Sequence, residues 1–279
     1  MTLLPEQLGH SKQELAAALK DLRKRAGLSG ARLAARCNMS QSKISRIENG
    51  KTPASLVDVK QILRALAAPP DTLARITELA RLANTEWQGL RALRRKGLHH
   101  KQQELAGLES TSAEFRFFML SMITGLLSTP EYIRASLAHL HGDQSQLIAR
   151  KLGRQEVLYD TGKKFTFLVS EMAAKWPLIP APAMALQLDR LISVSRLPNV
   201  RIGVIPLRGL MPAAPMDTFT VYDSSLVTIE TTSGVLALRD PKDIAAHLEA
   251  FSTMEGYAVF GADMRRLLER WADDFREAP

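Results

Sequence analysis

Apolar residues recur at helical spacing through the first third of the chain. Between residues 12 and 26 they lie on one face of a predicted helix, and basic side chains surround the rest of it. The same spacing predicts four more helices. Ser29 and Ser40 cap the second and third, Ala68-Pro69-Pro70 ends the fourth, and Asp71 or Thr72 begins the fifth. The expected core positions are Leu15, Ala18, Leu19, Leu22, Leu33, Ala34, Ile44, Ile47, Leu56, Val59, Ile62, Leu63, Leu66, Leu73, Ile76, Leu79 and Leu82.

Residues 28–50 have the spacing of a helix-turn-helix. Ala34 is a small residue at the point where two crossing helices touch, and Asn38 tolerates the left-handed backbone that a tight turn needs. Ile44 and Ile47 then anchor the third helix on its inner side. With that side buried, Gln41, Ser42, Ser45 and Arg46 point outward at the end of a helix that would enter a major groove. Glutamine pairs with adenine and arginine with guanine, so the chemistry favours base recognition.

The run MSQSKISRIENGKTP resembles the recognition helix and following loop of the Cro/repressor-like (XRE) helix-turn-helix family, and the resemblance covers about residues 15–68. It implies that Gln41, Ser42 and Arg46 meet base edges of double-stranded DNA. It also implies phosphate contacts from the residues around them, namely Ser40, Lys43, Asn49 and Lys51. Two positions depart from the family: Gly30 stands where a glutamine is usual, and Asn38 replaces the usual turn glycine. The alternative is a helix-turn-helix used only for protein contacts.

Charge is unevenly distributed along the chain. The net charge is +8, yet residues 1–104 hold 19 basic and 9 acidic side chains, while the rest hold 18 and 20. A basic first third favours nucleic acid as a partner, although charge alone would also suit a membrane surface.

No signal peptide is visible, and the longest uncharged run, residues 117–130, is too short to span a bilayer. The single cysteine, Cys37, excludes an intrachain disulfide and fits a cytoplasmic protein; we interpret it as a core residue rather than a redox sensor.

Beyond residue 112 the pattern changes to short strands between helices. Strands are expected at 114–120, 165–169, 200–205, 217–222, 226–231 and 235–239, the last three as an antiparallel meander. Helices are expected after Thr129 and at 144–158, 183–196, 242–254 and 262–276. The fold class is therefore an all-α domain of about five helices plus a larger mixed α/β domain with a short-stranded, largely antiparallel sheet. The expected boundaries are 1–83, a charged helical linker at 84–111, and 112–279.

Several runs in the larger domain resemble the carboxy-terminal domain of antitoxin-like actinobacterial regulators found in streptomycete developmental control. They are GLLSTPEYIRA, Arg154-Gln155, Glu171 after a strand, QLDRL followed by PNVRIGVIP, and AFSTMEGYA. The resemblance covers about residues 112–274. It implies regulation, sometimes with a small protein partner, and supplies no ligand.

Other candidate sites leave alternatives open. His139, His141 and Asp143 form an HxHxD run, but at a helix end they favour a polar terminus over a metal site. The acids Glu156, Asp160 and Glu171 are candidates for catalysis, yet the chain lacks a phosphate loop, a nucleophile elbow and a dinucleotide fingerprint. The Pro- and Met-rich residues 208–216 suit a ligand pocket or a partner surface, or a loop packed over its own core. In the linker, Arg91, Arg94, Arg95 and Lys96 suit either flanking phosphates or solvent.

The sequence thus predicts a homodimeric, DNA-binding regulator that uses no cofactor or metal. Its larger domain would dimerise and sense a small molecule or a partner protein. Two further hypotheses stay open. One is an antitoxin-like protein whose main role is binding a small partner, and the other is an enzyme fused to a DNA-targeting domain.

Overall fold

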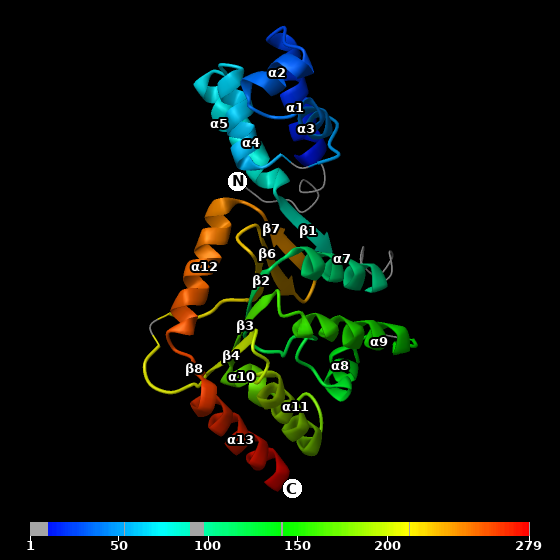
Figure 1. Ribbon diagram of the computed structural model, residues 1–279, viewed down its shortest axis with the longest axis vertical. Helices are drawn as coiled ribbons and strands as arrows, with labels where there is room; N and C mark the ends of the chain where they lie inside the picture. The colour runs from blue at the N-terminus through cyan, green and yellow to red at the C-terminus, as the bar shows by residue number, and fades with distance from the viewer. Residues whose placement is uncertain (1–10, 53, 90–97, 141, 212, 279) are drawn as a thin grey trace. The chain divides into compact units, whose positions relative to one another are not determined.

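The computed structural model of the chain describes residues 11–52, 54–89, 98–140, 142–211 and 213–278 (Figure 1). The chain divides into two compact units. The first consists of residues 1–88 with 234–244, and the second of residues 89–233 with 245–279. The fold class is as predicted, an all-α helix-turn-helix region and a mixed α/β domain.

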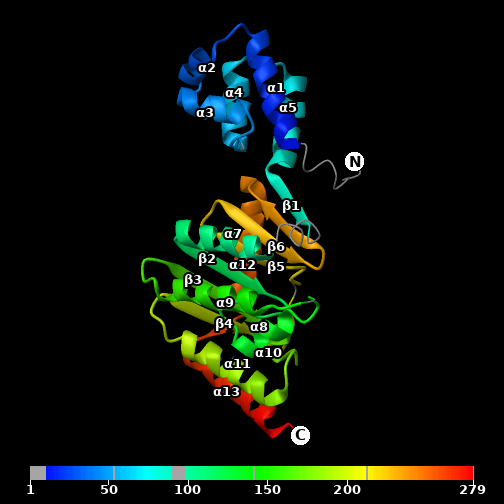
Figure 2. The same ribbon diagram turned by 90° about the vertical axis from the view of Figure 1, so that its right-hand side faces the viewer.

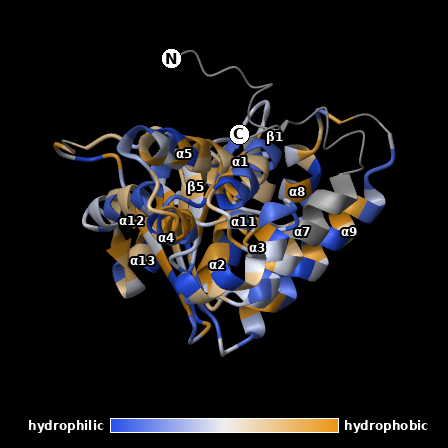
Figure 3. Cartoon of the chain, turned by 90° about the horizontal axis from the view of Figure 1, so that it is seen from above, coloured by the Kyte–Doolittle hydropathy of each residue, from blue (hydrophilic) through white to orange (hydrophobic). Residues whose placement is uncertain are grey.

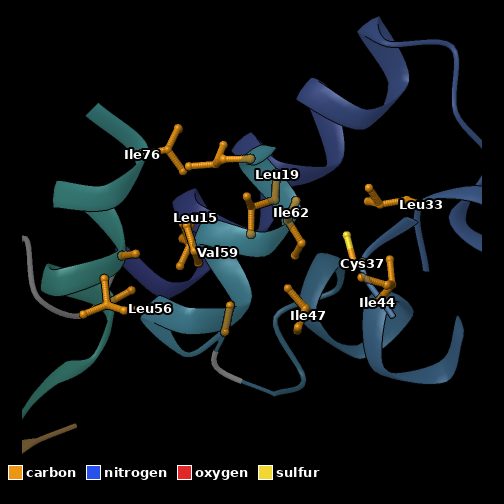
Figure 4. Packing of buried hydrophobic residues seen from close by; sticks show 14 of the residues in the cluster. Leu15, Leu19, Leu33, Cys37, Ile44, Ile47, Leu56, Val59, Ile62 and Ile76 are labelled. Atoms are coloured by element: carbon orange, nitrogen blue, oxygen red, sulfur yellow. The ribbon is translucent and has the colours of Figure 1, made fainter. Parts of the chain in front are cut away.

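Five helices form the body of the first unit. They are α1 (Ser11–Arg25), α2 (Gly30–Arg36), α3 (Gln41–Glu48), α4 (Leu56–Ala65) and α5 (Pro70–Ala83). Side chains from all five meet in one buried cluster, which includes Leu19, Leu33, Ile44, Ile62 and Ile76 (Figure 4). Leu73 is the exception among the predicted core positions, since it is exposed on α5.

Local chemistry sets where these helices begin and end. Ser29 Oγ accepts a hydrogen bond from Arg32 N at 3.2 Å, which satisfies an amide at the start of α2. Asn38 has a φ of +51°, the left-handed conformation expected at the turn, and Gly27, after α1, is also left-handed at +65°. Strand β1 (Thr85–Gly89) follows α5 and lies next to β7 (Gly234–Leu238) in the sheet order.

The second unit is built on a mixed sheet. Its strands are β2 (Glu114–Met119), β3 (Lys164–Ser170), β4 (Val200–Ile205), β5 (Thr218–Tyr222), β6 (Leu226–Thr231) and β8 (Val259–Phe260). Their order is β6-β5-β2-β3-β4-β8. The pairs β2–β3 and β3–β4 are parallel, whereas β2–β5, β5–β6 and β4–β8 are antiparallel. The predicted antiparallel pairing therefore describes the flanks of this sheet, and its centre is parallel.

Helices cover both faces of this sheet (Figures 1 and 2). They are α7 (Leu98–Thr111), α8 (Pro130–Ser136), α9 (Ser145–Gly153), α10 (Glu171–Lys175), α11 (Ala181–Val194), α12 (Pro241–Glu255) and α13 (Gly261–Glu277). Figure 1 shows α12 on one side of the strands and α7, α8 and α9 on the other. On one face Phe115 stacks on Phe165 at 4.7 Å between ring centroids, and on the other Phe219 meets the His247 ring of α12 at 5.0 Å. Because both faces are buried, the central strands are almost continuously apolar.

The outer helices are amphipathic, with hydrophobic and hydrophilic residues alternating along them (Figure 3). In α13 the buried residues Met264, Leu267, Leu268 and Trp271 repeat at helical spacing, and α13 packs beside α11. In the described residues, no helix combines the length and apolar composition needed to cross a bilayer.

Three expectations for individual elements need correction. Residues 85–89, expected in a helical linker, form strand β1, and the helix of that stretch is α7. The single helix expected over 144–158 is α9 followed by a 3-10 helix, Arg154–Tyr159. Gly153 weakens the helix at the junction, and Gln155 Nε2 donates to the carbonyls of Gly125 and Ser128 at 2.8 and 2.7 Å. The short elements α10 and β8 were not expected from the sequence.

Candidate nucleic-acid interface

Helix α3 presents one polar face to solvent. Ile44 and Ile47 are buried beneath it, and Gln41, Ser42 and Arg46 are exposed together with Ser45. Residues 41, 42, 45 and 46 share this face because a helix returns to the same side after three to four residues. The structure thus brings the three predicted base-reading side chains together on one outward surface.

The start of α3 is capped by Ser40. Its Oγ accepts a hydrogen bond from Lys43 N at 3.2 Å and lies 3.1 Å from Ser42 Oγ. The cap satisfies one of the free amides at the helix terminus, and the exposed end carries the positive pole of the helix dipole. A phosphate near Ser40 would therefore meet a favourable field.

The turn after α3 places Lys51 in solvent. Gly50 has a φ of +66°, and the amides of Lys51 and Thr52 donate to Arg46 O at 2.9 and 3.3 Å. Asn49 is already engaged, because its Nδ2 donates to Ser45 O at 2.8 Å and its Oδ1 accepts from Lys20 Nζ at 3.3 Å. The side chains of Arg46 and Lys51, by contrast, make no hydrogen bond or ion pair within the described part of the chain.

A buried ion pair fixes the far end of α3 against α1. Arg23 Nε and Nη2 donate to the two carboxylate oxygens of Glu48 at 2.6 and 2.7 Å, a bidentate geometry. Arg23 Nη1 also donates to Leu28 O at 2.8 Å. The hydrogen bonds that Arg23 donates to Glu48 raise the Arg23 pKa above its ordinary value. Glu48 therefore packs α3 against α1 and does not lie on its exposed polar face.

A second ion pair joins α3 to α4. Lys43 Nζ lies 2.7 Å from Asp58 Oδ1, and the Lys43 and Asp58 side chains are 39% and 12% exposed. Asp58 also belongs to a capping box with Ser55 at the start of α4. Lys43, predicted to bind phosphate, thus already has a carboxylate partner.

Some basic side chains near this face were not predicted from the sequence. Arg32 and Arg36 are exposed on α2 one turn apart, and Lys20 contacts Asn49 from α1. The i, i+4 spacing of the two arginines could have predicted that they share one face of α2. The linker residues Arg91, Arg94, Arg95 and Lys96 lie outside the described residues.

Cys37 lies in the turn region of the same domain and faces inward. It is buried in the core cluster at the end of α2, and burial raises the pKa of its thiol. A thiol with a raised pKa is a poor nucleophile at neutral pH, which favours the core interpretation.

The other candidate sites lie in the second unit. Asp143 Oδ1 accepts from Ser145 N and Oγ at 2.9 and 2.6 Å, just before α9, and these bonds lower its pKa. His141 lies outside the described residues, and among those described no group of three metal-ligating side chains is gathered. Glu171 Oε2 accepts from Leu207 N at 2.8 Å, and Asp160 Oδ1 accepts from Gly162 N at 3.0 Å.

A second surface lies where the parallel strands end. The carboxyl ends of β2, β3 and β4 meet at one edge of the sheet, as does the start of β5, where Thr218 Oγ1 accepts from Leu120 N at 3.1 Å. Leu210 and Met216 are 91% and 94% exposed, so these parts of the loop at 208–216 do not pack over the core. We name the apolar edge surface by its exposed residues: Met122, Met172, Trp176, Leu207, Leu210 and Met216.

A hollow of about 560 Å³ adjoins this loop. It lies between Arg208, strand β8 and α13, and its lining combines apolar and charged side chains of both signs: Val259, Leu267, Arg266, Arg270, Asp263, Glu269 and Asp273. Arg266 already donates a hydrogen bond to Asp263. This volume falls within the range of small-molecule sites.

Two families match the chain. Residues 102–270 match the family described as Domain of unknown function (DUF5753), and residues 14–76 match the family described as Helix-turn-helix domain. No curated protein matches the chain.

Among solved structures the similarity is low. NucT from Helicobacter pylori is 13% identical over 63% of this chain and 98% of its own, with a TM-score of 0.37. TrmBL2, an archaeal chromatin protein described as showing a novel mode of DNA binding, is 9% identical over 64% and 53%, with a TM-score of 0.34. The phospholipase D family member Nuc from Salmonella typhimurium is 10% identical over 57% and 90%, with a TM-score of 0.35. At these TM-scores none of the three supports an argument about this chain.

Proposed function

Because the chain belongs to the DUF5753 family and carries a helix-turn-helix domain, we propose that it is a sequence-specific DNA-binding transcriptional regulator. The helix-turn-helix domain indicates double-stranded DNA as the partner. One observation supports sequence reading above all others: Gln41, Ser42 and Arg46 share the exposed face of α3, whose opposite face is fixed in the core. The proposal places the protein in the cytoplasm, at the nucleoid when bound.

In this proposal α3 enters the major groove. Arg46 donates two hydrogen bonds to a guanine, Gln41 pairs with an adenine, and Ser42 reads a neighbouring base edge. Ser40 and Lys51 flank this face and hold phosphates, which set the position of the helix on the duplex. Asn49 would add a phosphate contact by exchanging its hydrogen bond to Ser45. Arg32 and Arg36 on α2 extend the basic surface.

We further propose a homodimer, with each copy reading one half-site. Half-sites read by paired recognition helices lie roughly 34 Å apart, one turn of DNA. The second unit would hold the dimer together and sense an effector. The hollow beside Arg208 supports a small-molecule effector, because its size suits a small molecule and both charged and apolar side chains line it. We assign no catalytic step to this unit.

The experiment that tests sequence reading is selection of bound DNA from random duplexes by the full chain. We expect an inverted repeat whose half-site centres lie about 10–10.5 bp apart. Enrichment of no sequence, with retention of all duplexes equally, would contradict base reading. Light scattering of the unbound protein measures the dimer independently, against the 30.9 kDa of one chain.

The apolar edge surface favours a second candidate function, an antitoxin-like role in which binding a small protein partner is primary and DNA binding serves autoregulation. Methionine side chains adapt to varied contacts, and large exposed apolar groups often mark interaction sites. Leu210→Ser with Met216→Ser should abolish recovery of a small stoichiometric partner in a pull-down, without lowering the unfolding midpoint. Leu186→Ser, an exposed leucine on α11, is the matched control. Recovery unchanged by the double substitution would contradict this role for the loop.

A further inference from the structure

The DNA-facing region of the first unit contains a carboxylate that is fixed in place. Asp58 Oδ2 accepts a hydrogen bond from Ser55 N at 3.3 Å, and Asp58 N donates to Ser55 Oγ at 3.1 Å. The other oxygen, Oδ1, lies 2.7 Å from Lys43 Nζ. The carboxylate also sits in the first turn of α4, where the helix dipole favours negative charge. Two hydrogen bonds with Ser55, the ion pair with Lys43 and the helix dipole therefore hold Asp58 in its present position.

Lys43 is bound to that carboxylate from the recognition helix itself. Its ammonium group is partly exposed, whereas the carboxylate is largely buried, so the ion pair is protected from solvent on the Asp58 side. Moving Lys43 onto a DNA phosphate would break this pair and leave an uncompensated carboxylate close to the duplex. Both consequences cost free energy.

We infer that Asp58 is an internal counter-ion, a positioning residue that keeps Lys43 off the DNA backbone and so limits affinity for DNA of any sequence. The inference rests on the proposed DNA-binding function and assigns Lys43 a different role from the phosphate contact that the family resemblance implies. Affinity then depends more on the base-reading face of α3, because one cation of the region adds nothing to sequence-independent binding.

The salt dependence of binding separates the two roles of Lys43. Each phosphate neutralised adds about 0.9 to the slope of log K against log salt concentration, which is about a 3.5-fold change between 50 and 200 mM salt. Lys43→Gln should leave the slope of the parent protein unchanged. Lys51→Gln, which removes an exposed cation without a partner in the described residues, should flatten it by about 0.9.

Asp58→Asn tests the counter-ion directly. The asparagine carbonyl still accepts the Ser55 N–H, so the capping box keeps its acceptor while the charge is lost. We expect the slope to steepen by about 0.9 on random and on selected DNA alike, and the ratio of the two affinities to stay unchanged, because the added phosphate contact is the same on both. Adding Lys43→Gln in the Asp58→Asn background should restore the parent slope. Circular dichroism and urea unfolding confirm that each variant is folded before its slope is interpreted.

Two results would overturn the inference. One is a flatter slope in Lys43→Gln alone, equal to that of Lys51→Gln, because Lys43 would then already contact phosphate. The other is an unchanged slope in folded Asp58→Asn. Failure of the proposed function looks different: the parent protein itself would not bind DNA at any salt concentration.

Discussion

Glu48 and Arg46 stand two residues apart in α3 and face opposite environments. Arg46 is exposed on the polar face, whereas the Glu48 carboxylate is 7% exposed and bound by Arg23. A buried ion pair adds little net stability when whole, yet loss of one partner leaves a charge without compensation. In the proposed function the helix reads DNA with Arg46, and the Glu48 ion pair holds it in place.

Replacing Glu48 tests this division. Glu48→Gln should lower the free energy of unfolding by about 3 kcal/mol, because the buried Arg23 guanidinium loses its counter-charge. Urea unfolding followed by circular dichroism measures the loss. Asp21→Asn removes the partner of Arg25 in a pair that is 76% and 54% exposed, and its effect should be much smaller. Equal losses in the two variants would show that the Arg23–Glu48 pair is not buried in solution.

Cys37 reactivity reports on the core beside the turn. Burial raises the pKa of the thiol, so the folded protein should react with a disulfide reagent at pH 8 far more slowly than the protein in urea. The thiol pKa is higher in the folded protein than in the unfolded chain, where it is about 8.5. The protonated thiol therefore stabilises the fold below pH 8.5, and this stabilisation is lost as the pH rises through the pKa of the folded protein. Equal rates of reaction with the reagent in buffer and in urea would contradict a buried Cys37 and would favour the redox-sensor interpretation.

At the scale of the element, the position of α3 depends on its neighbours. Arg23 of α1 and Asp58 of α4 bind its two ends, and the turn at Asn38 sets the angle at which it leaves α2. Asn38 has a φ of +51°, a region that asparagine tolerates better than other residues with a Cβ.

The turn can be tested with a matched pair of variants. Asn38→Ala should lower the free energy of unfolding by about 1 kcal/mol, because alanine pays the full cost of the left-handed conformation. Asn38→Gly should leave it nearly unchanged, since relief of strain is offset by greater freedom of the unfolded chain. Urea midpoints compare the two. If alanine and glycine behave alike, the backbone at position 38 is not left-handed in solution.

The helices of the first unit follow closely from the sequence. Serine caps, helical spacing and Ala68-Pro69-Pro70 are local signals. They predict the first and last residues of α2 and α3 to within a residue or two. The exposed face of α3 follows from the same spacing. The ion pairs could not be predicted in this way, because Arg23 and Asp58 lie 25 and 15 residues from their partners. Sequence spacing does not say which of many charged residues will meet in space.

The second unit was less predictable for a similar reason. The run Phe165–Val169, which is apolar except at Thr166, indicated a strand, and this strand is present. Their neighbours in the sheet depend on the path of the intervening chain, so the parallel centre had no local signal. Strand β1 has none of the apolar alternation of an ordinary strand, and the charges around it favoured a helix.

At the scale of the whole molecule, charge and family agree on a division of roles. The net positive charge of the first third belongs with the helix-turn-helix, and the near-neutral remainder belongs with the DUF5753 domain. DNA binding by the full chain should therefore weaken as salt rises, since exposed cations such as Lys51 release counterions on contact with phosphates. Sequence preference should persist across the same range, because it arises from hydrogen bonds to bases.

The measurement that tests the central claim most directly is the binding of Arg46→Ala to a selected DNA site and to random DNA of equal length. Arg75→Ala, which removes an exposed arginine from α5, outside residues 28–50, is the charge-matched control. We predict that Arg46→Ala loses about 1–3 kcal/mol of affinity for the selected site and much less for random DNA. Equal losses on both DNAs, or a loss no larger than that of Arg75→Ala, would contradict base reading by α3.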